Sequence, residues 1–530
     1  MPRPSHKSTR KAFLNKPENP RIIPGLGVDL PELQRARTLW GLNRTDEALA
    51  LFDEAVRTHP QNLVALVDAS RALGARFEIP RAEIMLDRLM QVARQRPDIL
   101  HLAGQSYRMI FRPDKAMDCF RRVLAATKQI PDSYLELAVL YERRHRLDEA
   151  FALIEECLRT APDYLEAKLF KARLLRRLKD EPASESLFRE LANQSLAHPD
   201  VRAQAWAEIA QTHDRRQEYE LAMAAMLKSK ENLLPREGLL LNRAETVMAD
   251  LRNLADSVTS AHYTSWSEGA SELSPQSVAV LTGFPRSGTT LLEQVLDSHP
   301  GLVSSDEREA FARDIFPAIW TTPETPRPTA PALDALPLKR METLRVRYLD
   351  YMASALNTPI GGRVHLDKNP TLTVILPGFL RLFPEAKVLV ALRDPRDVVI
   401  SCFMQYLPLN SNSVYFLSLE RASKRYANDL SLWKTLREKM VAPWLEVRYE
   451  DTVANLEREA RRALEFLGLP WDPAVLEYRE HLQDKGVASP TYEAVSQPIY
   501  TRAVDRWKNY EKFLQPCLPI LRPFIDSFGY

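Results

Sequence analysis

A glycine-rich stretch in the second half of the chain has the outline of a phosphate-binding loop. Gly283 and Gly288 stand five residues apart in GFPRSGTT, directly after the apolar segment SVAVLT and before the helical pattern LLEQVLDSHP. Glycines at this spacing let the backbone wrap around an anion, and the amides at the start of the next helix point toward it. The residue before Thr290 is Thr289 rather than lysine, so the loop cannot set an ammonium group between β- and γ-phosphates as ATPases do. Arg286 is the cation that this loop offers.

A second anion site is predicted where the segment KVLVAL ends at Arg393. The sequence RDPRDVVIS then carries the chain into a helix and places Ser401 eight residues after Arg393. An arginine offers a planar fork that suits a phosphate, and a serine hydroxyl on the helix can face the same anion. Two separate anion sites on one sheet suit a nucleotide that is phosphorylated at both ends, whereas ATP has no need of the second site.

Short apolar segments that alternate with amphipathic helices must position these two loops. The clearest strands are predicted at residues 277–282 and 387–392, and a third at 444–449. The first two are apolar enough to be buried on both faces of a parallel sheet. This alternation is typical of an α/β domain, in which ligands bind at the carboxyl ends of the strands. A helical, leucine-rich connector is predicted before this domain, at residues 233–270.

The first half of the chain has a period of 34 residues. Alanines recur at that interval, a small residue stands twelve residues before each alanine, and apolar residues stand four and eight residues after it. This spacing predicts helix-turn-helix units whose two helices cross closely at the small side chains. Prolines twelve or fifteen residues after each alanine close the units and predict a longer second helix in the two middle repeats. The alanines are Ala48, Ala82, Ala116 and Ala150, the small residues are Ala36, Ser70, Gly104 and Ala138, and the prolines are Pro60, Pro97, Pro131 and Pro162.

These patterns resemble two known families. The period of 34 residues resembles the tetratricopeptide (TPR) repeat over about residues 30–165, and weaker units around Ala183 and Ala222 extend the array to about residue 230. GFPRSGTT and RDPRDVVIS together resemble the 5′-phosphosulfate and 3′-phosphate loops of the sulfotransferases that use 3′-phosphoadenosine 5′-phosphosulfate (PAPS). This second resemblance covers about residues 275–530, and the spacing is most similar to the tyrosylprotein sulfotransferase branch and its bacterial TPR-bearing relatives.

The two resemblances imply a fold class and a division into domains. We expect an α/β P-loop-like sulfotransferase domain with a central parallel sheet, preceded by an all-α TPR solenoid. The expected domains are a disordered basic leader (1–28), a TPR helical repeat domain (29–232), a helical connector (233–275) and the sulfotransferase domain (276–530). The TPR surface is expected to hold a protein or peptide partner, the alternative being a rigid extension that only stabilises or dimerises the enzyme.

The sulfotransferase resemblance implies catalytic roles for four residues. Glu307, in the pair Asp306-Glu307, matches the general base that takes the proton from an acceptor hydroxyl as sulfur is attacked. Lys368 matches the lysine that meets the bridging oxygen of the leaving phosphate and stabilises the charge developing there. Arg286 would stabilise the sulfuryl group in flight, and Thr491 stands where the family has a hydroxyl that contacts the sulfate.

The same resemblance implies a set of residues that bind PAPS and its product 3′,5′-ADP. Tyr449 looks like the tyrosine that packs near the nucleotide, and Arg506 corresponds to a late basic residue that closes on the 3′-phosphate. No metal is expected, because a sulfuryl group carries less charge than a phosphoryl group and the ten histidines are dispersed. The expected cofactor-binding residues are Arg286, Ser287, Gly288, Thr289, Thr290, Arg393, Ser401, Tyr449 and Arg506.

Composition limits the partners and the compartment. The 72 Lys and Arg nearly balance the 70 Asp and Glu, which gives no general attraction to nucleic acid or to a membrane surface. The four cysteines are scattered, which favours a reducing compartment over a disulfide framework. The basic N-terminal stretch lacks the apolar core of a signal peptide, and we find no apolar run as long as a membrane span. We therefore expect a cytoplasmic protein with neither a nucleic-acid nor a membrane partner.

Two other functions stay open at this point. The chain could be a P-loop kinase or NTPase, or a TPR scaffold whose sulfotransferase-like domain is inactive. The identity of the acceptor is also open, since the hydroxyl could belong to a protein tyrosine, a glycan or a small molecule. Residues 308–313, REAFAR, have mixed charge, so recognition of an acidic tyrosine peptide is doubtful.

Overall fold

The computed structural model of the chain describes residues 29–42, 44–321, 327–480 and 503–530. The predicted leader at 1–28 therefore lies outside the described residues. The chain divides into two compact units, one of Met1–Leu187 with Asp350–Thr358 and one of Phe188–Leu349 with Pro359–Tyr530. The domain boundaries that the sequence predicts stay predictions.

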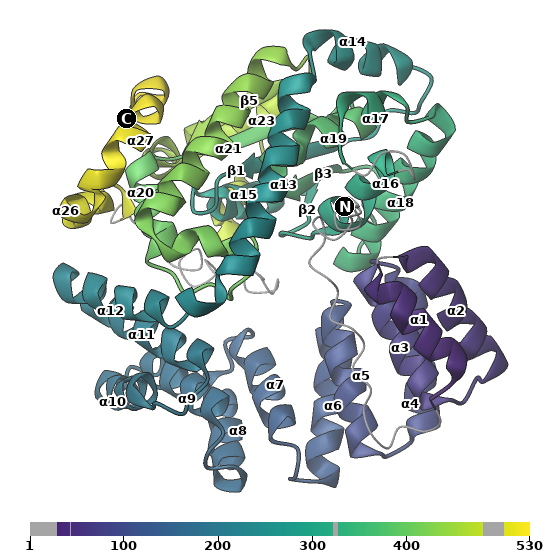
Figure 1. Cartoon of the computed structure of the whole chain (residues 1–530), viewed down its shortest axis with the longest axis vertical. Helices are drawn as coiled ribbons and strands as arrows, with labels where there is room; N and C mark the ends of the chain where they lie inside the picture. Colours follow the sequence, from purple (N-terminus) through teal and green to yellow (C-terminus); the bar gives the residue numbers. More distant parts are fainter. Residues whose placement is uncertain (1–28, 43, 322–326, 481–502) are drawn as a thin grey trace, which may run out of the picture. The chain divides into compact units, whose positions relative to one another are not determined.

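The first unit is a row of helix pairs (Figure 1). The two helices of each pair pack on one another, and the second helix of a pair also packs on the first helix of the next. This is the arrangement that the 34-residue period predicts, and the all-α N-terminal array is confirmed. Its helices are α1 (Pro31–Gly41), α2 (Thr45–Thr58), α3 (Leu63–Ala75), α4 (Ile79–Ala93), α5 (Pro97–Met109), α6 (Pro113–Ala126), α7 (Pro131–Glu142), α8 (Leu147–Thr160) and α9 (Leu165–Arg177).

Small side chains allow the two helices of a repeat to approach closely. The four alanines that recur every 34 residues are fully buried. At Gly104, an added Cβ would stand 2.6 Å from Cε1 of Phe120, closer than real Cβ contacts. The ring of Phe120 therefore packs directly against the backbone of α5, which explains why this position holds a residue without a side chain.

Four turns between paired helices, among the described residues, recur with the same period as the helices. Phe77, Phe111, His145 and Lys179 stand 34 residues apart, and all four have a positive φ, between 58° and 69°. L-residues seldom adopt this left-handed conformation, because their Cβ comes close to the following carbonyl oxygen. The repeat therefore fixes the backbone of its turns as well as that of its helices.

The second helix of a repeat is predicted to be longer in the two middle repeats. In the structure, this helix is longer by one residue in the second repeat, and the prediction is wrong for the third repeat. These helices, α2, α4, α6 and α8, have 14, 15, 14 and 14 residues. Pro97 and Pro131 do not end α4 and α6 but begin α5 and α7. Proline suits the first turn of a helix because the N–H that it lacks has no intrahelical partner there.

The second unit holds the sheet and most of the remaining helices, and both α10 (Glu181–Asn193) and α18 (Leu338–Leu356) cross the boundary between the units. Within the described ranges, each helix is too short or too polar to cross a membrane. The helices that follow are α11 (Pro199–Arg215), α12 (Tyr219–Glu231), α13 (Gly238–Ser257), α14 (Ser260–Gly269), α15 (Thr289–Asp297), α16 (Phe316–Trp320), α17 (Ala330–Asp334), α18 (Leu338–Leu356), α19 (Leu376–Leu382), α20 (Pro395–Phe403), α21 (Leu419–Lys439), α22 (Tyr449–Ala454), α23 (Leu456–Leu467), α26 (Glu511–Leu514) and α27 (Leu518–Phe528).

The predicted central parallel sheet is confirmed. Its five strands pair in the order β2-β3-β1-β4-β5, and every neighbouring pair is parallel. The chain builds β1 first, adds β2 and β3 on one side of it, and then crosses to add β4 and β5 on the other. Such a reversal in strand order opens a crevice at the carboxyl edge, where α/β proteins bind ligands. The strands are β1 (Val278–Gly283), β2 (Leu302–Ser304), β3 (Val364–Lys368), β4 (Lys387–Leu392) and β5 (Trp444–Arg448).

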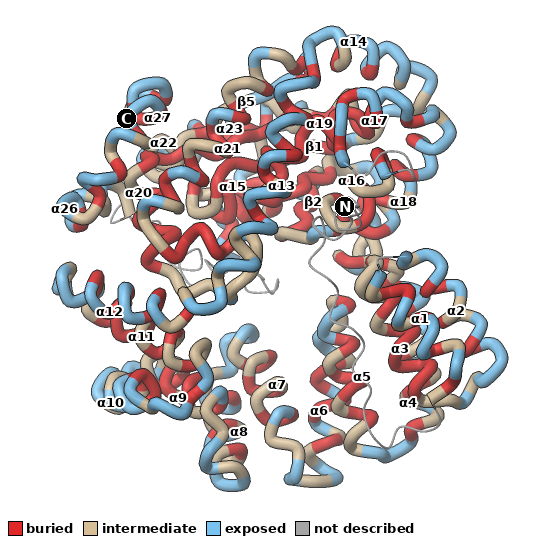
Figure 2. Tube along the Cα trace, in the orientation of Figure 1, coloured by how far each residue is buried: buried red, intermediate tan, exposed pale blue. Residues whose placement is uncertain are grey.

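Alternate residues of the central strands bury one face of the sheet under α15 and α23. Leu281 of β1 and Leu389 of β4 belong to one apolar cluster with Leu292 of α15 and Leu464 of α23. The residues between them on each strand, such as Val280, are also buried, because helices cover the opposite face as well. The trace of β1 and α15 is accordingly buried in Figure 2. The loops at the carboxyl edge therefore rise from a rigid base.

Candidate active site

The carboxyl ends of all five strands carry residues that the sequence singles out. Because the strands are parallel, these ends meet at one edge of the sheet. The predicted site is thus assembled from segments more than 150 residues apart in the chain, between Gly283 and Tyr449. β1 runs into the loop 283–290, β2 leads to Asp306 and Glu307, β3 ends at Lys368, β4 leads to Arg393 and β5 leads to Tyr449.

Two glycines shape the loop that follows β1. Gly283 has a φ of 150°, and an added Cβ would stand 2.5 Å from the carbonyl oxygen of Ala391 on β4. Gly288 has a φ of 91°, and its added Cβ would stand 2.6 Å from Cδ2 of Tyr449. Both positions combine a left-handed backbone with a close neighbour, so only glycine fits without a shift. The second glycine precedes α15 and leaves the amides at the start of that helix facing the loop.

The two predicted anion loops touch each other. Nε of Arg286 donates a hydrogen bond of 3.1 Å to Oγ of Ser401 on α20. Nη1 of Arg393 donates one of 3.1 Å to the carbonyl oxygen of Arg286. The guanidinium carbon of Arg393 also lies 4.8 Å from the centre of the Tyr449 ring, a cation–π distance. The structure thus brings Arg286, Arg393, Ser401 and Tyr449 together.

The two predicted loops offer hydrogen-bond donors that suit an anion. Nε of Arg393 is buried and has no hydrogen-bond partner among the described residues, so one N–H of this guanidinium is available to an anion. Arg286 and Ser401 add further donors beside the amides of the first loop. An acidic group also lies near Arg393, since Oδ2 of Asp397 is 3.8 Å from its Nη2. Burial raises the pKa of Asp397 to about 6, which reduces its negative charge near that pH.

The predicted base and the predicted lysine are in direct contact. Nζ of Lys368 donates a hydrogen bond of 2.7 Å to Oε1 of Glu307. Lys368 is fully buried, and two more carboxylates lie near its ammonium, Glu293 at 3.2 Å and Asp306 at 3.6 Å. Burial alone would lower the pKa of Lys368, but these three carboxylates outweigh it and raise that pKa above its ordinary value. The lysine is therefore held as an ammonium ion.

The turn that carries the base has an unusual backbone. Asp306 and Glu307 are consecutive residues with positive φ, 41° and 58°. The N–H of Glu307 donates a hydrogen bond of 2.9 Å to the carbonyl oxygen of Lys368, so the turn is tied to the end of β3. Backbone strain of this kind persists only where neighbouring groups hold it, and it clusters at functional sites.

Glu293 is a member of this site that the sequence analysis missed. It lies on α15, has no exposed surface, and contacts Lys368, Asp306 and Ser304. The available signal was a glutamate within LLEQVLD, since a charged residue in a helix that is apolar on several sides needs a buried partner.

A second buried carboxylate lies just before the lysine. Oδ2 of Asp367 accepts a hydrogen bond of 2.6 Å from the hydroxyl of Tyr348 on α18, and Oδ1 accepts one of 3.3 Å from Oγ of Ser305. Burial raises the pKa of Asp367 to about 6 despite these bonds and the nearby Lys368. Asp367 therefore supports the end of β3 through its contacts with the neighbouring elements.

Arg506 lies in a C-terminal segment that contacts both α11 and α20. Its Nη2 lies 3.0 Å from Oδ1 of Asp214 on α11, and the hydroxyl of Tyr510 donates to the same oxygen. On the other side, the N–H of Trp507 donates a hydrogen bond of 2.7 Å to Oδ1 of Asp397 on α20. The structure therefore engages the Arg506 guanidinium with α11, and its predicted contact with the 3′-phosphate stays a prediction. Thr491 lies outside the described residues.

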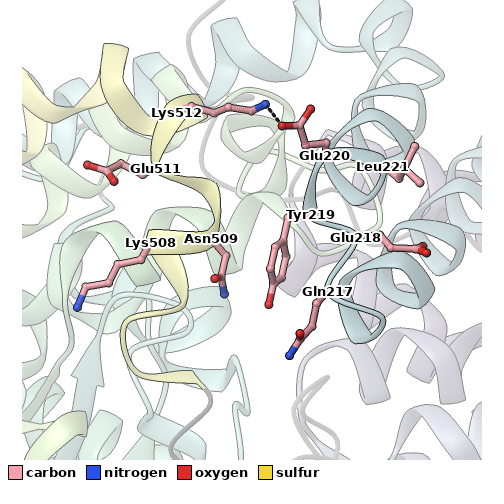
Figure 3. Close-up of a pocket in the computed structure, with 9 residues that line it drawn as sticks. All are labelled: Gln217, Glu218, Tyr219, Glu220, Leu221, Lys508, Asn509, Glu511 and Lys512. Carbon is pink, nitrogen blue, oxygen red and sulfur yellow. Dashed lines mark hydrogen bonds and ion pairs between the residues drawn. The ribbon is translucent and has the colours of Figure 1, made fainter.

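A cavity of about 500 Å³ lies between α12 and this C-terminal segment. Figure 3 shows Lys512 reaching Glu220 across it, beside Tyr219 and Asn509. The rings of Tyr219 and Tyr510 meet edge to face, with centres 5.4 Å apart. The cavity is thus lined by mixed charges near the fastening point of the segment, and the predicted base is not among its lining residues. Among the described residues, no three His, Cys, Asp or Glu side chains are grouped as metal ligands.

Comparison with known proteins supports both predicted families. Residues 279–473 match the model of the sulfotransferase family, and residues 132–161 match that of the tetratricopeptide repeat. The chain is 25% identical over 265 residues to protein-tyrosine sulfotransferase 1 of Danio rerio, which covers 47% of this chain and 70% of that protein. It is also 26% identical over 271 residues to protein-tyrosine sulfotransferase 1 of Homo sapiens, and this match covers 47% of this chain and 68% of that protein. The predicted resemblances are therefore confirmed.

One further sequence relative and one solved structure are also similar to parts of this chain. An uncharacterized protein of Aquifex aeolicus (strain VF5) is 26% identical over 339 residues, which covers 63% of this chain but only 43% of that protein. This chain therefore spans less than half the length of that relative. Among solved structures, the sulfotransferase domain from the Synechococcus PCC 7002 olefin synthase is 21% identical, covers 49% of this chain and 97% of its own, and has a TM-score of 0.35.

Proposed function

We propose that this chain, whose residues 279–473 match the sulfotransferase family, transfers sulfonate from PAPS to an acceptor hydroxyl. The observation that best supports the proposal is the direct contact of the two anion loops, through the hydrogen bond from Arg286 to Ser401. A carrier with a phosphosulfate at one end and a 3′-phosphate at the other needs two adjoining anion sites. A nucleoside triphosphate needs only the first.

In this proposal, the two loops divide the ends of the carrier between them. Arg286, with Ser287, Gly288, Thr289 and Thr290, would hold the phosphosulfate end, because these residues supply a guanidinium, hydroxyls and the amides that open α15. Arg393 and Ser401 would hold the 3′-phosphate, with Tyr449 beside them and Arg506 as a further contact. When bound, PAPS supplies a sulfuryl group on a phosphate that leaves readily.

The remaining chemistry belongs to the acidic and basic groups at the ends of β2 and β3. Glu307 would accept the proton of the acceptor hydroxyl, and Lys368 would face the oxygen from which the sulfuryl group departs. Their present contact of 2.7 Å means that each group partly neutralises the other until substrates separate them. Thr491 is proposed as a further contact to the sulfate. No metal is required by this set of residues.

Two other functions have less support. A kinase or NTPase does not need a second anion site at Arg393 and Ser401. A P-loop NTPase also has a lysine, which contacts the β- and γ-phosphates, where this chain has Thr289. An inactive scaffold lacks a reason to keep a buried lysine among three carboxylates, since replacing such a whole cluster with apolar side chains of similar volume is often neutral or stabilising. The acceptor stays open between a protein tyrosine, a glycan and a small molecule, and the TPR surface is proposed to hold a protein or peptide. The cytoplasmic location stays a prediction.

The proposal is tested by incubating the protein with PAPS labelled in its sulfonate and a panel of hydroxyl acceptors. Glu307→Ala should reduce transfer by about 10²–10⁴-fold, the usual contribution of a general base. Its affinity for 3′,5′-ADP, measured by calorimetry, should stay within about two-fold of the original, because the anion loops are intact. Tighter binding of ATP than of 3′,5′-ADP would instead favour the kinase or NTPase. Binding of 3′,5′-ADP without transfer to any acceptor would favour the inactive scaffold.

A further inference from the structure

Glu293 contacts two parts of the predicted site, the turn at Asp306 and the ammonium group of Lys368. Its Oε1 accepts a hydrogen bond of 3.0 Å from the N–H of Asp306 and another of 2.6 Å from Oγ of Ser304. Its Oε2 lies 3.2 Å from Nζ of Lys368. The buried carboxylate of Glu293 therefore contacts both the turn that carries Glu307 and Lys368, the lysine that donates to Glu307.

The hydrogen bond to Asp306 bears directly on the geometry of the base. Asp306 and Glu307 have positive φ in succession, a conformation that L-residues adopt only when their surroundings hold it. The turn is held at Asp306 by the carboxylate of Glu293 and at Glu307 by the carbonyl oxygen of Lys368. Without the first of these bonds, the buried N–H of Asp306 would lose its acceptor, and the turn would relax toward an ordinary backbone. Glu307 would move with it.

The position of Glu293 along α15 adds a second constraint. The helix begins at Thr289, directly after Gly288 of the first anion loop, so Glu293 follows that loop by about one helical turn. The hydroxyl of Ser304, at the end of β2, fixes the direction of the carboxylate. A rigid helix thus links the loop proposed to hold the phosphosulfate to the turn proposed to hold the base.

We infer that Glu293 is a positioning residue that sets Glu307 and Lys368 relative to the donor loop. The inference rests on the proposed function, because it concerns the same site. Glu293 acts on the reaction only through Asp306, Glu307 and Lys368. Displacement of a reacting group by about 1 Å is enough to reduce a rate by roughly 10²-fold, so the contribution of such a residue is measurable.

The test compares two variants of Glu293 with a matched control. Glu293→Gln keeps an oxygen that accepts from Asp306 and loses only the charge beside Lys368, whereas Glu293→Leu loses both. Glu459→Gln serves as the control, because Glu459 on α23 is also buried and paired with arginines, Arg458 and Arg462. Rates are measured over a range of PAPS and acceptor concentrations, and 3′,5′-ADP binding by calorimetry.

We expect kcat to fall by about 10-fold in Glu293→Gln and by about 10²-fold or more in Glu293→Leu. Affinity for 3′,5′-ADP should change by no more than about two-fold in both, and Glu459→Gln should match the unmodified protein. Hydrogen exchange of the peptide that covers residues 304–310, followed by mass spectrometry, should be faster in Glu293→Leu. This last measurement needs no activity.

Two results would overturn the inference. One is a folded Glu293→Leu protein with unchanged kcat and unchanged exchange in the peptide 304–310. The other is a loss of 3′,5′-ADP affinity in step with kcat, which would indicate a general structural role. If Glu293→Leu does not fold, Ser304→Ala decides, because it removes only the hydroxyl that orients the carboxylate. In that variant a fall in kcat of about three- to ten-fold supports the inference, and an unchanged kcat overturns it.

Failure of the proposed function would look different. In that case the unmodified protein would transfer no sulfonate and would not bind 3′,5′-ADP. Faster exchange of the peptide 304–310 in Glu293→Leu would still show that this carboxylate holds the turn, whatever reaction the turn serves.

Discussion

The repeat unit and the carboxyl edge of the sheet place their charges in opposite ways. In the repeats, many charged pairs lie at the surface, as between Arg144 and Asp114, whose side chains are 39% and 82% exposed, although the pair of Arg37 with Asp68 is largely buried. At the sheet edge, Lys368 and Glu293 pair with no exposure at all. Exposed pairs contribute little to stability, whereas a buried charge depends on its partner. The repeats are therefore held by close apolar packing, and the sheet edge contains a charge cluster that its fold must support.

The largest expected effect comes from removing the buried lysine. Lys368→Met deletes the ammonium from among three carboxylates, and we expect it to lower the free energy of unfolding of the second unit by about 3–5 kcal/mol. The matched change in the repeats is Lys115→Met, whose lysine is 42% exposed and pairs with Glu83 and Asp87. That change should lower stability by about 0.5 kcal/mol. Urea unfolding, with the transitions of the two units fitted separately, measures both, and equal losses would contradict the comparison.

A pH titration of stability sharpens the same contrast at Asp367. Its pKa is raised to about 6 in the folded protein, against about 3.9 in an unfolded chain. Between these values the folded carboxyl keeps its proton while the unfolded one has lost it. Its stabilising contribution is therefore fully present below about pH 4 and is lost as the pH rises through 6. The stability of Asp367→Asn relative to the unmodified protein should accordingly grow by roughly 2 kcal/mol from pH 4 to pH 7. A difference that does not vary with pH would refute this assignment.

Packing rather than charge should dominate in the repeats. Gly104→Val places new atoms where a Cβ already stands 2.6 Å from Phe120, so we expect a loss of about 1–3 kcal/mol from overpacking. Gly238→Val is the control, because an added Cβ there meets no atom within 4 Å. Its effect should be within about 0.5 kcal/mol. Thermal unfolding of both variants decides the point, and a tolerated Gly104→Val would mean that α5 and α6 can separate without loss.

The smallest effect is expected at the turns of the repeats. Lys179 is exposed and has a φ of 69°, so Lys179→Gly should raise stability by about 0.5–1 kcal/mol by relieving the left-handed strain. Lys179→Ala removes the same side chain but keeps the Cβ, and it should give no such gain. Differential scanning calorimetry resolves shifts of this size. A gain of equal size in both variants would show that the side chain, and not the backbone, carries the strain.

The repeats were predictable because their information is local. Ala48 and Ala82 reveal the unit through spacing alone, and a helix pair depends mostly on residues within that spacing. The prolines led to a wrong prediction of helix length, because proline can follow the end of a helix but also suits its first turn, where Pro97 and Pro131 lie. The left-handed turns at Phe77 and Phe111 could not be foreseen, since phenylalanine does not favour that conformation by type.

At the sheet edge, the sequence indicated which segments follow the strands better than which side chains are in contact there. The loop beginning at Gly283 and the strand before Arg393 both have strong local patterns, and the structure joins the loops as two anion sites on one sheet require. Glu293 has no local pattern of its own, because its partners Ser304 and Lys368 lie 11 and 75 residues further along the chain. The pairing of Arg506 with Asp214 spans 292 residues and was equally hidden.

That last pairing sets a limit on how the protein can be shortened. A truncated protein that starts at residue 276, where the sheet region was predicted to begin, would lack α11. Arg506 and Tyr510 would then lose the carboxylate that both contact, and the segment would keep the hydrogen bonds of Trp507 to Asp397 and of Arg393 to Ala503. A shortened protein that keeps the contacts of Arg506 and Tyr510 with Asp214 therefore starts upstream of Pro199, within what looks by its repeats like a separate module.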